Sequence, residues 1–111
     1  MNIYDTANKL ATEIKDSSEY TEYKKLKELI NNNEDKKMKV EEFEHLRYKI
    51  QLNQIQGNLD SIEEDKNTVQ EKYSKLLQDE EIKKYFEVEV KFNVMIADVN
   101  RIIAEAIKDV I

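Results

Sequence analysis

The segment that decides the fold is YFEVEVKFNVMIADVNRIIAEAIKDV, residues 85–110, which is the most apolar part of the chain. Its apolar residues recur at alternating steps of three and four, a spacing that places them on one side of an α-helix. The first row comprises Tyr85, Val88, Phe92, Met95, Val99, Ile102 and Ala106. A second row lies beside it, so the helix should contact at least two others. This second row comprises Ile96, Ile103 and Val110.

A β-strand is the alternative interpretation of residues 86–94. Apolar and polar side chains alternate there, and several of the apolar residues are β-branched valines, as in a half-buried strand. A strand needs a partner, however, and no other segment of the sequence alternates in this way. The helical period also continues through Ile111 without a turn residue. We therefore predict a helix.

Length and composition limit the architecture. The chain has 111 residues, so we expect a single domain over residues 1–111. It is 40% hydrophobic and 38% charged, with one glycine and no proline, and a sheet-rich fold would need more turn residues. So many charges in a chain of this size leave a thin core, and a second copy would add buried area. We therefore expect a homodimer.

Charge and residue usage disfavour several functions. The net charge is −6, and direct nucleic-acid binding needs clustered positive charge. Cysteine is absent, so disulfides and thiolate metal sites are excluded. No apolar run is long enough to span a bilayer, and the first ten residues do not resemble a signal peptide. We expect a cytoplasmic protein without direct nucleic-acid or membrane contact.

The sequence begins with a clear helix signal. Asn2 is a plausible N-cap, and the helix should fade near Asp16, since Asp16, Ser17 and Ser18 prefer caps over helix interiors. Its apolar stripe consists of Ile3, Tyr4, Ala7, Leu10, Ala11 and Ile14.

A second helix should start at Ser17 or Ser18 and close at the asparagines 31–33. It carries Tyr20 and Tyr23 one turn apart. Two such rings can form a ligand-stacking surface, but they more often line the edge of a core with their hydroxyl groups in water.

Two more helices are expected before the last one. The third should run from residue 35 or 36 to 56, with Gly57 as its C-terminal cap. Ser61 and Glu64 have the spacing of a capping box, which predicts the start of a fourth. Asp79 is a weaker second start signal, so the fourth and fifth helices are either separate or one kinked helix. The predicted fold is an elongated antiparallel helical bundle of four to five helices with a long C-terminal helix.

Chemical motifs are weak. Glu42 and His45 form E-x-x-H on a helix, a spacing that recurs in di-iron carboxylate bundles. His45 is the only histidine, so one chain cannot supply the second copy of the motif, and the acidic residues around it indicate a solvated face. One glycine cannot make a phosphate-binding loop. We predict no enzyme activity, no cofactor and no metal.

The apolar face of the last helix is the remaining candidate site. It can form an intramolecular core, a dimer or partner seam, or both. The candidate interface residues are Phe86, Phe92, Met95, Ile96, Val99, Ile103, Ile107 and Val110. Met95 is flexible enough to serve either role.

Residues 2–31 (NIYDTANKLATEIKDSSEYTEYKKLKELIN), 43–58 (FEHLRYKIQLNQIQGN) and 87–107 (EVEVKFNVMIADVNRIIAEAI) carry a family resemblance. The chain resembles the YlbF/YmcA family of small bacterial helical proteins, and its YheA-like branch most closely. The resemblance implies an antiparallel bundle that self-associates, and it brings no catalytic residue.

Relatives in this family act in competence, sporulation and biofilm formation of Gram-positive bacteria. YlbF and YmcA join a third protein, YaaT, and act with the endoribonuclease RNase Y in mRNA maturation. Those branches carry cysteine-containing tails linked to an iron–sulfur cluster. This chain has no cysteine, so the resemblance does not extend to the cluster and gives no support for membership of that complex.

The sequence thus predicts a non-enzymatic cytoplasmic regulatory or adaptor protein. It would act through helical protein–protein contacts, as a homodimer and with other protein partners. The alternative is a small-ligand or metal carrier that uses the tyrosine-rich second helix or Glu42 and His45.

Overall fold

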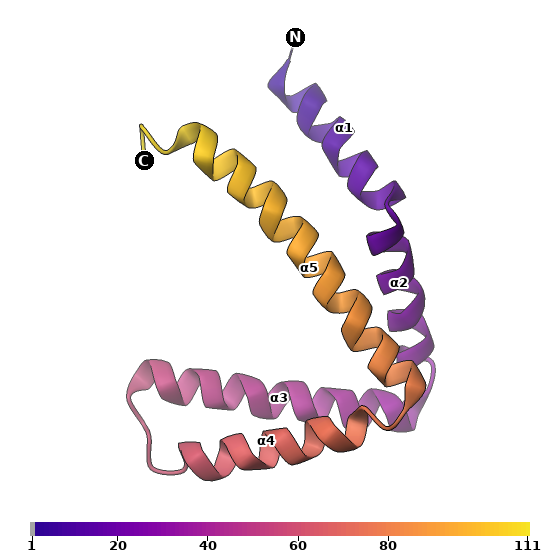
Figure 1. Ribbon diagram of the computed structural model, residues 1–111, viewed down its shortest axis with the longest axis vertical. Helices are drawn as coiled ribbons and strands as arrows, with labels where there is room; N and C mark the ends of the chain where they lie inside the picture. Colours follow the sequence, from indigo (N-terminus) through magenta and orange to yellow (C-terminus); the bar gives the residue numbers. More distant parts are fainter. Residues whose placement is uncertain (1) are drawn as a thin grey trace. The chain divides into compact units, whose positions relative to one another are not determined.

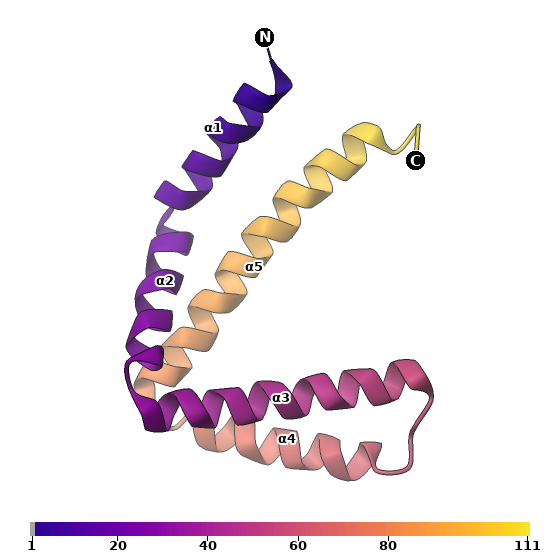
Figure 2. The same ribbon diagram turned by 180° about the vertical axis from the view of Figure 1, so that it is seen from behind.

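The computed structural model describes residues 2–111, and this range contains five α-helices and no strand (Figures 1 and 2). The predicted all-α class is confirmed, and residues 86–94 are helical rather than extended. In chain order the helices are α1 (Ile3–Asp16), α2 (Ser18–Asn31), α3 (Glu34–Gln56), α4 (Ile62–Leu76) and α5 (Glu80–Ile107).

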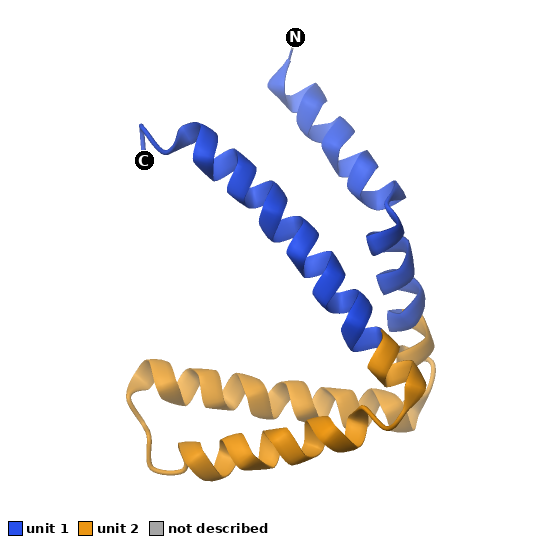
Figure 3. Cartoon of the chain, viewed as in Figure 1, with its two compact units in different colours: residues 1–27, 85–111 blue, residues 28–84 orange. Residues whose placement is uncertain are grey.

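The chain packs as two compact units, coloured separately in Figure 3. Unit 1 comprises residues 1–27 and 85–111, and unit 2 comprises residues 28–84. Helices α2 and α5 each contribute to both units. These compact units do not test whether residues 1–111 fold as a single domain, and the single domain expected from the chain length stays a prediction.

Side-chain caps begin the first two helices where the sequence predicted. The Asn2 side-chain oxygen Oδ1 accepts a hydrogen bond of 2.8 Å from the Tyr4 amide at the start of α1. The Ser17 hydroxyl accepts one of 3.2 Å from the Tyr20 amide at the start of α2. Each bond satisfies an amide that has no partner inside its own helix.

Gly57 ends α3 in the left-handed conformation, with φ 76°. The backbone N–H of Asn58 donates to the carbonyl oxygen of Asn53 at 2.9 Å, which satisfies one of the last free carbonyl groups of the helix. The chain can then reverse direction, so α3 and α4 run antiparallel as the hairpin of unit 2 (Figures 1 and 2).

The predicted capping box at Ser61 and Glu64 is wrong. Helix α4 begins at Ile62, but the Ser61 side chain makes no cap hydrogen bond. Ser61 has φ −117° and ψ 13°, away from the extended conformation usual at an N-cap. Its hydroxyl instead donates to the Asp65 carboxylate at 3.2 Å.

Aromatic and aliphatic packing holds unit 2 together. The Phe43 and Tyr73 rings stack across α3 and α4, with centroids 5.5 Å apart and planes at 27°. The Arg47 guanidinium lies 5.4 Å from the Phe43 centroid, within cation–π range. The buried side chains of the unit are Ile30, Val40, Phe43, Ile50, Leu76 and Ile82.

Helices α4 and α5 are separate, because residues 77–79 form a turn between them. Oδ1 of Asp79 accepts hydrogen bonds from the amides of Glu81 and Ile82, at 2.9 and 3.2 Å. Asp79 is therefore the N-cap of α5, and the second start signal in the sequence marks a real helix start.

Candidate protein interface

An aromatic cluster covers the first part of the α5 apolar face within unit 1. The Tyr23 ring lies 5.9 Å from Tyr85 and 5.2 Å from Phe92, and the Tyr20 ring lies edge-on to Phe92 at 6.1 Å. The Tyr23 hydroxyl donates to the Glu89 carboxylate at 3.4 Å. Tyr20 and Tyr23 are half-buried, so α2 uses these rings to pack against α5.

Beyond this cluster, coverage of the apolar face of α5 fades, and Val99 is the last half-buried residue of the helix. We call residues 97–110 the distal segment. Val88 in the covered part is 1% exposed, whereas Ile102 in the distal segment is 66% exposed. Ile103, Ile107 and Val110 are also exposed. The periodic apolar pattern therefore continues for several turns past the helix that covers it.

Charged side chains of the distal helix lie on its opposite side. Arg101 pairs with Asp98, and Lys108 pairs with Glu105, both at 3.2 Å. At 100° per residue, these four positions fall within about 80° of the helix circumference. The charged residues thus pair with one another and leave the apolar side free of charge.

A groove of about 620 Å³ lies between the start of α2 and the middle of α5, inside unit 1. Val90 and Val94 contribute apolar surface and are 60% and 54% exposed. Glu19 and Glu22 supply acidic groups from α2. The backbone N–H of Glu19, the Ser18 hydroxyl and, more weakly, Lys91 hold the Glu19 pKa below its ordinary value.

The eight predicted interface residues differ in accessibility. Phe86 is buried, with its ring 5.6 Å from that of Tyr85, so it offers little surface within this chain. Phe92, Met95, Ile96 and Val99 are half-buried, while Ile103, Ile107 and Val110 are exposed. The interface role of all eight stays a prediction.

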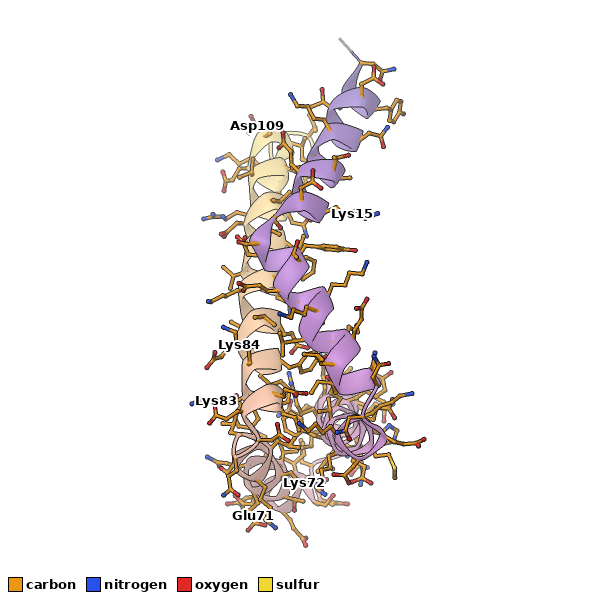
Figure 4. The ribbon with its side chains drawn as sticks, turned by 90° about the vertical axis from the view of Figure 1, so that its right-hand side faces the viewer. Lys15, Glu71, Lys72, Lys83, Lys84 and Asp109 are labelled. Carbon is orange, nitrogen blue, oxygen red and sulfur yellow. The ribbon has the colours of Figure 1, made fainter. Side chains whose placement is uncertain are left out.

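Helix α1 presents a second uncovered apolar face, which the sequence interpretation did not include in the interface. None of its residues is buried, and Ile3 and Tyr4 are 77% and 73% exposed. Only Leu10 and Ile14 are partly covered. Figures 1 and 2 show α1 diverging from α5 towards the two termini, and Figure 4 marks Lys15 on α1 and Asp109 just past α5. The clean apolar stripe of residues 3–14 was the signal that could have identified this face.

Glu42 and His45, the metal candidates, are both exposed on α3. Within residues 2–111, the structure brings no three His, Cys, Asp or Glu side chains together in an arrangement that could hold a metal ion. None of the helices in the same range is both long and apolar enough to cross a membrane.

Taken together, the described residues form an all-α protein whose most distinctive surface is an apolar helix face without a neighbour. A family model described as "Control of competence regulator ComK, YlbF/YmcA" matches residues 3–108. The chain therefore belongs to the YlbF/YmcA family, and this membership supports a regulatory role.

Similar proteins span nearly the whole chain. It is 33% identical to a UPF0342 protein of Alkalihalophilus pseudofirmus, over 98% of this chain and 92% of the relative. It is 35% identical to a UPF0342 protein of Desulfitobacterium hafniense, over 100% of this chain and 89% of the relative. It is 36% identical to a UPF0342 protein of Halothermothrix orenii, over 93% of this chain and 86% of the relative. No solved structure matches the chain.

Proposed function

We propose that this chain is a non-enzymatic regulatory or adaptor protein that acts through helical protein–protein contacts, as a homodimer in the cytoplasm. The observation that carries the proposal is the uncovered, charge-free apolar side of the distal segment. Soluble proteins rarely leave a large contiguous apolar patch in water, and such patches mark interaction sites. Family membership adds independent support.

For the biological setting, we propose the YheA-like branch of the family in Gram-positive bacteria. The three segments quoted for the resemblance support this placement. Competence, sporulation, biofilm formation and mRNA maturation with RNase Y are the processes of the better-known relatives. They are the first to examine in a strain that lacks this protein.

Native mass spectrometry of the purified wild-type protein tests the homodimer. We expect the mass of two chains and no additional bound mass. A monomer at every concentration would contradict the homodimer. An extra bound mass would instead favour the alternative, a small-ligand or metal carrier. Affinity capture from the native cell should also recover protein partners, and recovery of none above background would contradict the adaptor role.

Ile103→Glu tests the position of the interface, because it places a charge in the apolar face. We expect the dissociation constant of the dimer to rise at least about tenfold, or about 1.4 kcal/mol. Ile55→Glu is the matched control, because Ile55 is 75% exposed on α3 in unit 2. A folded Ile103→Glu variant that dimerises like the wild type would show that the interface lies elsewhere.

A further inference from the structure

Two exposed valines of α5 belong to neither predicted apolar row of that helix. Val90 and Val94 contributed to the strand-like alternation in the sequence, yet both lie in the helix and are 60% and 54% exposed. At 100° per residue, Val90 lies about 160° around the helix from the buried Val88, and Val94 lies about 180° from Ile103. The two valines are therefore outside both the core of unit 1 and the uncovered apolar face of the distal segment.

Both valines line the groove between the start of α2 and the middle of α5. Met95, Val99 and Ile102 continue its apolar lining along α5. The distance from residue 90 to residue 102 along a helix is about 18 Å, or about three turns. The groove thus offers an apolar strip long enough to hold a short helix.

The lining of the groove is acidic. Glu19 and Glu22 contribute two carboxylates from α2 and Asp98 a third from α5, against the single ammonium group of Lys91. Asp98 is already paired with Arg101 at 3.2 Å, so the two glutamates of α2 are the acidic groups that can attract an occupant. Charge complementarity favours a cationic one.

The occupant must also suit an open groove with helical walls. Small-molecule sites enclose most of the ligand surface, whereas Val90 and Val94 remain more than half exposed. An extended peptide takes its backbone hydrogen bonds from the edge of a sheet, and residues 2–111 contain no strand. A helix satisfies its own backbone groups, and an amphipathic helix lays its apolar side into a groove.

We propose that this groove binds a basic amphipathic helix of a partner protein. The apolar side of that helix packs on Val90 and Val94, and lysine or arginine side chains at its edge pair with Glu19 and Glu22. The inference rests on the adaptor role proposed above and deepens it by naming the class of partner. A helix packed on the two valines leaves Ile103 uncovered, because that residue lies on the other side of α5.

Synthetic peptides test the pairing by fluorescence anisotropy at physiological salt, which screens weak surface attraction. The first is a peptide of about 14 residues with leucine at helical spacing and lysine elsewhere, long enough to span the groove as a helix. The second has glutamate in place of lysine, and the third is the leucine–lysine peptide in an order without an apolar stripe. We expect the first to bind the wild-type protein at least about tenfold more tightly than the other two. Equal binding of the first peptide and either of the others, or no binding at all, overturns the proposal.

Charge reversal locates the binding site. Glu19→Lys/Glu22→Lys should weaken binding of the leucine–lysine peptide about tenfold and strengthen binding of the leucine–glutamate peptide. Glu63→Lys/Glu64→Lys is the matched control, because it changes the net charge equally at two exposed glutamates of unit 2. Circular dichroism checks that both variants stay helical. Equal effects of the two pairs would show that the overall negative charge attracts the peptide, and would overturn the proposal.

The apolar part of the groove is tested without any change of charge. Val90→Ser/Val94→Ser should keep the fold, because both side chains are exposed, and should weaken the leucine–lysine peptide about tenfold. Ile55→Ser/Leu59→Ser is the matched control, since these residues of unit 2 are 75% and 62% exposed. Unchanged binding by a folded valine variant overturns the proposal.

Failure of this inference is distinct from failure of the proposed function. A wild-type protein that dimerises and captures protein partners but binds no peptide overturns the groove and leaves the adaptor role standing. A wild-type protein that captures no partner in the cell, yet binds the leucine–lysine peptide through Glu19 and Glu22, contradicts the adaptor role and supports the binding preference of the groove.

Discussion

The Lys36 ammonium nitrogen lies 3.1 Å from Oδ2 of Asp79 and 3.3 Å from Oδ1, and so joins the first turn of α3 to the N-cap of α5 within unit 2. It also lies 3.5 Å from Oε1 of Glu81. The same Asp79 carboxylate accepts two backbone amides of α5. The Asp79 side chain therefore caps the start of α5 and also links it to Lys36 on α3.

Asp79→Ala should lower the free energy of unfolding by about 1–2 kcal/mol. Loss of an N-cap costs about 1 kcal/mol, and loss of a partly exposed ion pair adds less than that. Lys36→Met removes the ion pair but keeps the cap, and should cost less. Urea denaturation of both variants checks the order. Equal losses would show that the cap contributes nothing.

The same pair predicts the pH dependence of stability. Burial raises the Asp79 pKa, but the Ile82 amide, the Lys36 ammonium and the Glu81 amide outweigh it and hold the pKa below 3.8. The hydrogen bond to Asp79 raises the Lys36 pKa above 10.5, against a smaller effect of burial. A lowered carboxyl pKa stabilises the fold above 3.8, and this stabilisation is lost as pH falls through the folded-state value. A raised ammonium pKa stabilises below 10.5 and is lost as pH rises through the folded-state value.

The difference in unfolding midpoint between wild type and Asp79→Ala should therefore be constant between these two pH values. The difference should shrink below pH 3.8, where the wild-type Asp79 carboxylate becomes protonated and loses its charge. A difference that stays unchanged throughout the acidic range would contradict the assigned role of the Asp79 charge.

Gly57→Ala should destabilise the chain by about 1–2 kcal/mol, the cost of a left-handed conformation for a residue with Cβ. A Cβ atom added at Gly57 meets nothing within 4 Å, so the cost is conformational and not a clash. Gly57→Asn should cost less, because asparagine tolerates this conformation better. Thermal unfolding monitored by circular dichroism measures both. Equal stability of the alanine variant and the wild type would contradict the observed φ.

Ile82→Ala and Ile102→Ala should separate folding from association. Ile82 is 1% exposed, so its truncation should cost about 2–5 kcal/mol at any protein concentration. Ile102 is 66% exposed, so its truncation should leave the isolated chain unchanged and weaken only the dimer. Denaturation at several protein concentrations distinguishes the two effects. A concentration-independent loss in Ile102→Ala would place that side chain in the core of one chain.

Helix ends were the most predictable part of the fold, because they depend on a few adjacent residues. Asn2, Ser17 and Gly57 act as the sequence indicated. Ser61 did not, because its backbone lies away from the extended conformation of an N-cap, and its hydroxyl donates to Asp65 one turn ahead. The sequence offered both bonds and could not rank them.

The sequence did not predict how much of the apolar face of α5 is covered by other helices. The spacing of Tyr85, Val88 and Phe92 continues into Ile102 with the same period, yet the first three are packed within the chain and the last is exposed. Periodicity shows which residues share a side of a helix. It does not show where the neighbouring helix stops, which depends on how α1 diverges from α5. For the same reason the sequence identified the α5 face as a candidate interface but did not include α1.

The turn between α3 and α4 has a practical consequence. Residues 57–61 are all exposed, and Leu59 in the middle is 62% exposed, so an exposed non-helical segment is accessible there to a protease. A cut at this point leaves each helix of the hairpin with its own ring of the Phe43–Tyr73 stack. The two fragments can therefore stay associated after cleavage, which makes this loop the natural position for splitting the protein into complementing halves or for inserting a reporter.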